Sequence, residues 1–291
     1  MNKNLYALIT GASEGFGRAL AIECARRKMN LILVALPETN LHPLADFIKF
    51  HHSVDVISIE KDLCKDESCI ELFDEVNSSG LQVNMLFNNA GIGSTGLFED
   101  GSISLFENQI KLNVLATTLI TRLFLQMLKQ NSPSYILNVG SLASYFSLPR
   151  KQVYGATKSF IYYFSKSLRK ELKKDNVSVS VLCPGGMFTN KEVKLTIEAN
   201  YFSRVSSMDP EEVVPAAIDG LLRKKAVIIP GMLNKCFLLM DAILPAFIKT
   251  ALLNNTMKKI NARGSLAFLP KRLTVSPVPQ STPKFIPSIN S

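Results

Sequence analysis

The stretch LYALITGASEGFGRALAIECARRK, residues 5–28, joins a short apolar run to an amphipathic one through a turn with three glycines. Residues 5–10 have the length and composition of a buried strand, and residues 17–28 have the apolar spacing of a helix. A strand that enters a helix through glycines offers unpaired backbone N–H groups to a ligand such as a diphosphate. Tight turns need glycine for structural reasons too, so this turn alone does not establish a binding site.

The same alternation continues along the chain. Further strands are predicted at 31–36, 54–60, 83–91, 134–141, 177–185 and 226–230. Further helices are predicted at 40–50, 66–78, 104–130, 152–174 and 210–223. Strictly alternating elements with apolar strands predict parallel strands that are covered by helices on both faces. The predicted fold is therefore a single α/β domain with a doubly wound parallel sheet, whose ligands bind at the carboxyl ends of the strands.

Composition limits the class of protein. The 291 residues are 47% hydrophobic and 20% charged, enough to bury the core of one large domain or two small ones. The five cysteines are odd in number and contain no Cys-x-x-Cys, which argues against a disulfide framework or a zinc site and favours a reducing, cytoplasmic location. The three histidines lack metal-ligand spacing, so no metal is expected. The short apolar run at the start does not resemble a signal peptide, and a membrane-spanning helix is not expected.

The net charge of +9 is concentrated near the end of the chain. From residue 254 onward there are six basic residues and no acid, which leaves +3 for residues 1–253. The body of the protein therefore shows no excess of positive charge typical of a nucleic-acid-binding face.

A tyrosine and a lysine lie four residues apart in the predicted helix 152–174. Positions i and i+4 share one helix face, so the phenol of Tyr154 and the ammonium of Lys158 would lie side by side. A nearby ammonium favours phenolate and is expected to lower the pKa of Tyr154 from its ordinary value near 10. The pair is short enough to occur by chance on an exposed helix face, so its meaning depends on the rest of the chain.

Several motifs, taken together, resemble the short-chain dehydrogenase/reductase family. They are Thr10-Gly11-x-x-x-Gly15-x-Gly17, Asp62-Leu63, Asn88-Asn89-Ala90-Gly91, Asn113, Ser141, Tyr154-x-x-x-Lys158 and Pro184-Gly185-x-x-x-Thr189. They occur in the order and spacing of that family over roughly residues 4–230, with Ser141 placed 13 residues before Tyr154. Each is short, but the set is specific. The resemblance implies a Rossmann-like fold and an NAD(P)-dependent oxidoreductase that acts on CH–OH and C=O groups.

The resemblance implies four catalytic residues. Tyr154 would protonate the carbonyl oxygen as hydride arrives, or deprotonate the alcohol in the reverse direction. Lys158 would also bind the nicotinamide ribose, Ser141 would hold the substrate oxygen, and Asn113 would help to seat a water that relays protons. The cofactor itself would supply or accept the hydride.

The resemblance also implies the residues that contact the cofactor. They are Thr10, Gly11, Ser13, Gly15, Phe16, Gly17, Asp62, Leu63, Asn89, Ala90, Gly91, Tyr154, Lys158, Pro184, Gly185 and Thr189. Among them, Asp62 would meet the adenine ring, Asn89 would line the adenosine side, and Thr189 would bind the nicotinamide carboxamide.

The choice between NAD and NADP depends on the end of the second predicted strand. An acid there binds the ribose hydroxyls, whereas a nearby arginine accepts the 2′-phosphate. Leu36 and Pro37 occupy this place and make neither contact. Glu14 stands where many NADP-dependent members carry a basic residue, which argues against a phosphate. NADP(H) is slightly favoured over NAD(H), because the reductases that the chain resembles generally use it.

The substrate is expected to be a fairly apolar ketone or alcohol, such as a fatty-acyl or steroid-like molecule. Residues 190–206 fall where the family places its substrate lid, and they include Leu195, Ile197, Tyr201 and Phe202. The helices at 104–130 and 152–174 match those that pair between subunits of the family, which implies a homodimer or homotetramer.

The sequence predicts a catalytic domain over 1–232, a helical segment over 233–263, and a disordered basic tail over 264–291 that is rich in Pro and Ser. Two alternatives to an enzyme are a non-catalytic dinucleotide-binding sensor and a protein that docks on membrane surfaces through residues 236–260 and the tail. The complete catalytic set argues against the first. The second is compatible with an enzyme, although a helix that closes the domain is the favoured interpretation of residues 236–260.

Overall fold

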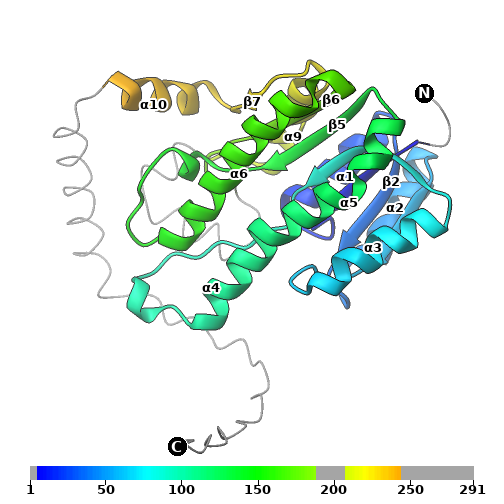
Figure 1. Ribbon diagram of the computed structural model, residues 1–291, viewed down its shortest axis with the longest axis horizontal. Helices are drawn as coiled ribbons and strands as arrows, with labels where there is room; N and C mark the ends of the chain where they lie inside the picture. The colour runs from blue at the N-terminus through cyan, green and yellow to red at the C-terminus, as the bar shows by residue number, and fades with distance from the viewer. Residues whose placement is uncertain (1–4, 188–206, 244–291) are drawn as a thin grey trace, which may run out of the picture. The chain divides into compact units, whose positions relative to one another are not determined.

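The computed structural model describes residues 5–187 and 207–243, which belong to one compact unit that ends at Ile243 (Figure 1). The expected lid at 190–206, Thr189, residues 244–263 and the tail at 264–291 lie outside the described residues.

A single parallel sheet forms the centre of this unit. Its seven described strands lie in the order β3-β2-β1-β4-β5-β6-β7. Their bounds are β1 Leu5–Thr10, β2 Asn30–Ala35, β3 Val56–Glu60, β4 Gln82–Asn88, β5 Ser134–Val139, β6 Val177–Leu182 and β7 Val227–Ile228. Strand order reverses between β1 and β4, so a switch point lies where their carboxyl ends meet. The predicted doubly wound α/β fold is confirmed.

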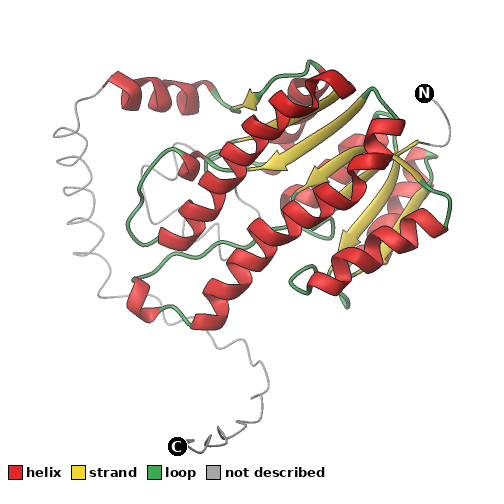
Figure 2. Cartoon of the chain, viewed as in Figure 1, coloured by secondary structure: helices red, strands yellow, loops and turns green. Residues whose placement is uncertain are grey.

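Helices cover both faces of the sheet (Figure 2). The described helices are α1 Gly15–Arg26, α2 Leu41–His52, α3 Asp66–Ser78, α4 Ile103–Ile110, α5 Thr117–Gln130, α6 Gln152–Glu171, α9 Pro210–Leu222 and α10 Met232–Ile243. One core cluster joins α1, α2 and α9 to one face of the sheet. A second cluster joins α3 and α5 to the other face, where α6 packs over β6.

The strands are apolar on both sides because both sides are buried. In β2, Leu31 and Leu33 belong to the first cluster, whereas Ile32 and Val34 belong to the second. All four side chains are fully buried. Burial of each such side chain contributes about 1.5–3 kcal/mol relative to exposure, so continuous apolar runs are needed at these positions.

The helix that was predicted over 104–130 is interrupted. Between α4 and α5 the chain makes a π-helical turn over Lys111–Ala116, which contains Asn113. A π turn is wider than an α turn and often marks a functional site. Neither Pro nor Gly occurs in this turn, so the sequence pattern did not reveal it.

Two further observations concern the protein's environment. All five cysteines lie within the described residues, and each is free. None of the helices within 5–187 and 207–243 has the length and apolar character needed to span a bilayer.

Candidate active site

The predicted catalytic side chains come from three elements that meet beyond the carboxyl ends of β4, β5 and β6. Ser141 follows β5 and caps a short 3-10 helix, Leu142–Ser144. Tyr154 and Lys158 lie on successive turns of α6, and Asn113 lies in the π turn. In Figure 1, α6 runs along the β5–β6 side of the sheet, so the helix presents its first turns near the end of β5.

Ser141 and Tyr154 are brought together. The Ser141 side chain hydrogen-bonds with the Tyr154 hydroxyl and favours its phenolate form. Ser141 Oγ also accepts a hydrogen bond of 3.1 Å from the backbone N–H of Ala143, which fixes the serine rotamer. A substrate carbonyl oxygen between the two hydroxyls would therefore meet two oriented groups.

Lys158 is buried beside them. Its Nζ donates a 2.7 Å hydrogen bond to the carbonyl of Val139, the last residue of β5, and lies 5.9 Å from the centroid of the Tyr154 ring. Burial lowers the pKa of Lys158 to about 8, because desolvation disfavours the ammonium.

The pKa of Tyr154 departs from the sequence-based expectation. We expected Lys158 to lower it, but in this structure it is raised. The largest cause is burial, which disfavours phenolate, and the Ser141 hydrogen bond only partly offsets it. Since the pKa of Lys158 is itself lowered, the phenol is the more weakly acidic of the two groups and remains protonated near neutral pH.

Asn113 uses its amide to join the π turn to two neighbours. Its Nδ2 donates to Ile92 O at 2.9 Å and to Thr157 Oγ1 at 3.0 Å, and its Oδ1 accepts from Ile92 N at 2.9 Å. Both amide hydrogens are therefore committed to the protein. The predicted water would have to be seated by the remaining acceptor capacity of Oδ1 or by backbone atoms.

The glycine turn forms a tightly packed cradle. A Cβ at Gly11 would lie 2.9 Å from Ala90 Cα, and a Cβ at Gly17 would lie 2.0 Å from Gly11 O. The φ of Gly11 is +65°, a left-handed conformation that disfavours other residues. The N-cap residue of α1, Glu14, makes no side-chain capping bond, and the first turn holds no acidic residue, so backbone N–H groups remain open to a diphosphate and the turn fits a dinucleotide.

The turn is tied to the end of β4. Thr10 Oγ1 accepts hydrogen bonds of 3.0 Å from the N–H groups of Asn89 and Ala90. Asn89 Nδ2 donates to the carbonyls of Thr10, at 2.9 Å, and Gly11, at 3.0 Å. Its Oδ1 makes no hydrogen bond within the described part of the chain, so this is the atom available for the predicted adenosine contact.

Other predicted cofactor residues differ in what they expose. The side chains of Phe16 and Leu63 are buried in the two core clusters, so any cofactor contact must come from their backbones. Asp62 Oδ1 accepts a 3.1 Å hydrogen bond from Cys64 N. Pro184 O accepts a 2.8 Å hydrogen bond from Leu142 N, which ties the end of β6 to the Ser141 loop. Ser13, Gly15 and Gly185 are half-buried, and Gly91 is exposed.

Residues 5–200 match the family described as short chain dehydrogenase. The chain belongs to this family. Very-long-chain 3-oxoacyl-CoA reductase of Mus musculus is 30% identical over 185 residues, which cover 62% of this chain and 58% of the relative. 11-beta-hydroxysteroid dehydrogenase A of Arachis hypogaea is 34% identical over 178 residues, which cover 61% of this chain and 50% of the relative. The chain thus spans about three fifths of the length of the first relative and half of the length of the second.

A short-chain dehydrogenase of Sphingobium yanoikuyae, solved in complex with NADPH, has the same fold. It is 25% identical, with a TM-score of 0.70, and the alignment covers 91% of this chain and 98% of that one. The predicted family is confirmed.

Sequence reasoning missed three residues of this short-chain dehydrogenase site. Thr157 accepts from Asn113, and its hydroxyl donates to Tyr154 O at 2.8 Å. Cys183 raises the pKa of Tyr154 electrostatically, so its thiol lies close to the phenol. Lys151 lies over the Tyr154 ring, with Nζ 5.7 Å from the centroid. Thr157 and Lys151 lie three residues on either side of Tyr154, and that helical spacing was the available signal.

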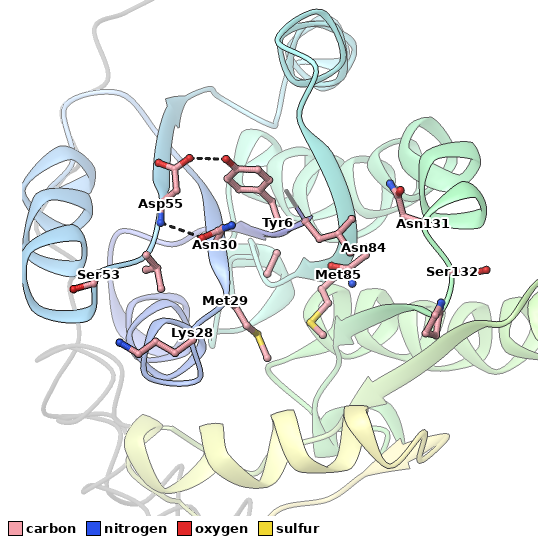
Figure 3. Close-up of a pocket in the computed structure, with 14 residues that line it drawn as sticks. Tyr6, Lys28, Met29, Asn30, Ser53, Asp55, Asn84, Met85, Asn131 and Ser132 are labelled. Atoms are coloured by element: carbon pink, nitrogen blue, oxygen red, sulfur yellow. Dashed lines mark hydrogen bonds between the residues drawn. The ribbon is translucent and has the colours of Figure 1, made fainter. Parts of the chain in front are cut away.

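A cavity of about 670 Å³ lies at the opposite edge of the sheet, where β1 begins (Figure 3). Several of its polar groups already have hydrogen-bond partners within the protein. Tyr6 donates to Asp55 at 2.5 Å, Lys28 donates to His52 O at 2.8 Å, and Asn131 donates to Gln82 at 3.0 Å. Ligands of doubly wound sheets bind at the carboxyl edge, so this cavity is not the catalytic site.

Proposed function

We propose that the protein is an NAD(P)-dependent oxidoreductase that transfers hydride between the cofactor and a ketone or secondary alcohol. The observation that carries the proposal is the arrangement of Ser141, Tyr154 and Lys158 around one point at the carboxyl edge of the sheet. The glycine cradle, which fits a dinucleotide, lies at the same edge.

The chain's own residues have separate roles in this reaction. Ser141 orients the carbonyl oxygen, and the neutral Tyr154 donates a proton to it. Lys158 holds the nicotinamide ribose, and the glycine turn holds the diphosphate. The nicotinamide cofactor supplies the hydride when it is bound. A phenol whose pKa is raised is kept in its proton-donating form, which is the form that carbonyl reduction requires.

The substrate that we propose is a fairly apolar carbonyl compound. The two curated relatives named above carry names that refer to 3-oxoacyl-CoA and to an 11-beta-hydroxysteroid. Each has an extended hydrocarbon part, the acyl chain or the steroid skeleton, which agrees with the apolar residues in the sequence at 190–206. These relatives support a substrate of this class for the present chain.

For the cofactor we propose NADP(H). Leu36, at the end of β2, is 54% exposed and supplies no carboxylate that would repel a 2′-phosphate. The solved relative from Sphingobium yanoikuyae is in complex with NADPH. Glu14 opposes the choice, because it is exposed at the N-cap of α1.

We further propose a homodimer or homotetramer, formed through α4 and α6. Ile103 and Ile110 on α4 are 78% and 51% exposed, and Phe160 and Tyr163 on α6 are 42% and 65% exposed. The two helices pack against each other, so these side chains present exposed apolar surface on neighbouring elements. Burying this surface against a second copy is favourable, because each Å² of buried apolar surface contributes about 25 cal/mol to the free energy of binding before the cost of association is subtracted.

Two alternatives remain distinct from this enzyme. A dinucleotide sensor would need the cradle but not Ser141 or Tyr154. Contact with a membrane surface is favoured by the exposed Met232, Leu233 and Leu239 on α10, and it is compatible with catalysis.

We propose a cytoplasmic, reducing location, which the five free cysteines support.

A cofactor-oxidation assay tests the proposal. Purified protein is mixed with NADPH or NADH and a panel of medium-chain, long-chain and steroid ketones. We expect ketone-dependent oxidation of the cofactor, faster with NADPH. Binding of either cofactor without turnover of any ketone in the panel would favour the sensor instead.

A further inference from the structure

Lys151 is a second cation beside the catalytic tyrosine. It caps the N-terminus of α6, three residues before Tyr154. Its Nζ lies 5.7 Å from the centroid of the Tyr154 ring, about as close as Lys158 Nζ, at 5.9 Å. Lys158 is bonded to Val139 O and has an assigned role, whereas the mechanism gives Lys151 none.

The ammonium of Lys151 has no oxygen partner among the described residues. Three other lysines in that part of the chain are buried or half-buried, and each has one. Lys61 pairs with Glu71 at 2.9 Å, Lys129 pairs with Asp175 at 2.8 Å, and Lys158 donates to Val139 O at 2.7 Å. The half-buried Lys151 forms neither an ion pair nor a side-chain hydrogen bond there.

Partial burial of this unpaired ammonium lowers the stability of the folded protein. Burial lowers the pKa of Lys151, because the ammonium loses water without gaining an anion. A desolvated cation normally finds a carboxylate or a carbonyl oxygen. Its neighbour in sequence, Arg150, has the same sign of charge. Arg150 therefore supplies no anion to Lys151.

The backbone holds Lys151 in this place. The Arg150 carbonyl accepts a 2.9 Å hydrogen bond from Gly96 N, and Lys151 N donates to Leu148 O at 3.2 Å. The Lys151 carbonyl accepts a 2.7 Å bond from Gly155 N as α6 begins. Bonds on both sides of the residue fix where its side chain starts, so its position over the ring is built into the loop.

We propose that Lys151 recognises a carboxylate on the substrate, so that the preferred substrate is an oxo acid with an apolar chain. This inference rests on the proposed function, because it assumes that the reacting carbonyl is held by Tyr154 and Ser141. The carbonyl oxygen then lies at the hydroxyl end of the Tyr154 ring, and the ammonium lies over the same ring. A carboxylate a few bonds from the ketone would reach it, and the rest of the molecule would remain apolar.

A matched set of substrates and variants tests the inference. The substrates are medium-chain oxo acids with the ketone at C3, C4 or C5, together with their methyl esters, which keep the ketone but remove the charge. The variants are Lys151→Met, Lys151→Arg and the control Lys170→Met. Lys170 is exposed near the end of α6, so its substitution changes the same charge on the same helix, away from the site.

We expect Lys151→Met to lower kcat/KM for at least one oxo acid by roughly ten- to hundredfold, the range for a hydrogen bond to a charged group. The loss should appear mainly in KM. The methyl esters should change by less than about twofold, Lys151→Arg should keep most of the preference for the acid, and Lys170→Met should change neither class. A parallel loss of kcat on acids and esters, or no loss on either, would overturn the inference.

A binding measurement separates this inference from the proposed reaction. A saturated fatty acid of the same chain length cannot be reduced, so its affinity for the cofactor-saturated protein can be measured by calorimetry. If no ketone is turned over but this affinity falls in Lys151→Met and not in Lys170→Met, Lys151 binds carboxylates and the reaction is wrong. If ketones are reduced and neither affinity nor acid preference depends on Lys151, the inference is wrong and the reaction stands.

Discussion

At the residue scale, burial governs both groups of the tyrosine–lysine pair. The sequence suggested that the ammonium would make the phenol more acidic, because only the spacing of Tyr154 and Lys158 was visible. The structure adds desolvation, which raises the pKa of Tyr154 and lowers that of Lys158 to about 8. Burial depends on the loops that surround α6, and the five residues from Tyr154 to Lys158 do not carry that information.

The pH dependence of reduction should follow Lys158. Below pH 8 its ammonium is charged and can hold the ribose, and above its pKa of about 8 the charge is lost. We therefore expect kcat/KM for the cofactor to fall as pH rises through about 8. In Lys158→Ala, this fall should disappear, with a lower kcat and a higher KM for the cofactor at neutral pH. An unchanged pH profile and cofactor KM in this variant would show that Lys158 has no such role.

Glu14 should limit the use of NADPH. It is exposed at the N-cap of α1, where its charge would repel a 2′-phosphate. We expect Glu14→Lys to raise the ratio of kcat/KM for NADPH to that for NADH by roughly tenfold, since an ionic hydrogen bond contributes about 1.5–3 kcal/mol and exposure weakens it. Glu67→Lys makes the same change in the first turn of α3 and serves as the control. Equal ratios in the three proteins would place Glu14 away from the phosphate.

At the scale of elements, alternation and apolar runs were enough to predict the strands and most helices. These patterns worked because a buried strand and an amphipathic helix each have a characteristic spacing of apolar residues along the local sequence. The π turn at Lys111–Ala116 was not predicted, because its stability depends on distant partners. Asn113 in that turn is held by Ile92 and by Thr157 of α6, which lie 21 and 44 residues away.

The glycine turn gives a direct test of packing at this scale. A Cβ at residue 17 would lie 2.0 Å from Gly11 O, so the backbone must shift. We expect Gly17→Ala to reduce stability by about 1–3 kcal/mol, the usual cost of overpacking, and to weaken cofactor binding at least as much. Thermal unfolding and fluorescence titration with NADPH measure the two effects.

Gly96→Ala is the matched control, because a Cβ there would meet no atom within 4 Å. It should behave like the wild type in both measurements. If Gly17→Ala also binds NADPH with wild-type affinity, then the tight turn does not form the diphosphate site.

At the scale of the whole molecule, the doubly wound sheet could be predicted, and its switch point located the site. The sequence could not predict how copies of the chain associate, because an apolar helix face has the same pattern whether it packs against the core or against a partner. The exposed residues of α6 become visible as a surface only once the opposite face of this helix, which includes Ile161, is assigned to the core.

The oligomer should depend on α6. We expect the wild type to form a dimer or tetramer at micromolar concentration by light scattering, and the double variant Phe160→Glu, Tyr163→Glu to become smaller, because charges would be buried at the interface. Phe50→Glu is the control, since Phe50 is 84% exposed on α2. A wild-type monomer, or a double variant of unchanged mass, would contradict the proposed interface.

Tyr154 is proposed as the proton donor of a carbonyl reduction, and Tyr154→Phe removes the proton that it would donate. The change removes one hydroxyl and keeps the ring, so the fold and the cofactor cradle should persist. We measure NADPH affinity by titration and NADPH oxidation with a ketone that the wild type reduces. We expect nearly unchanged NADPH affinity and a loss of turnover of at least about 100-fold, the lower end of the usual contribution of general acid catalysis. Near-wild-type turnover in Tyr154→Phe would contradict this role.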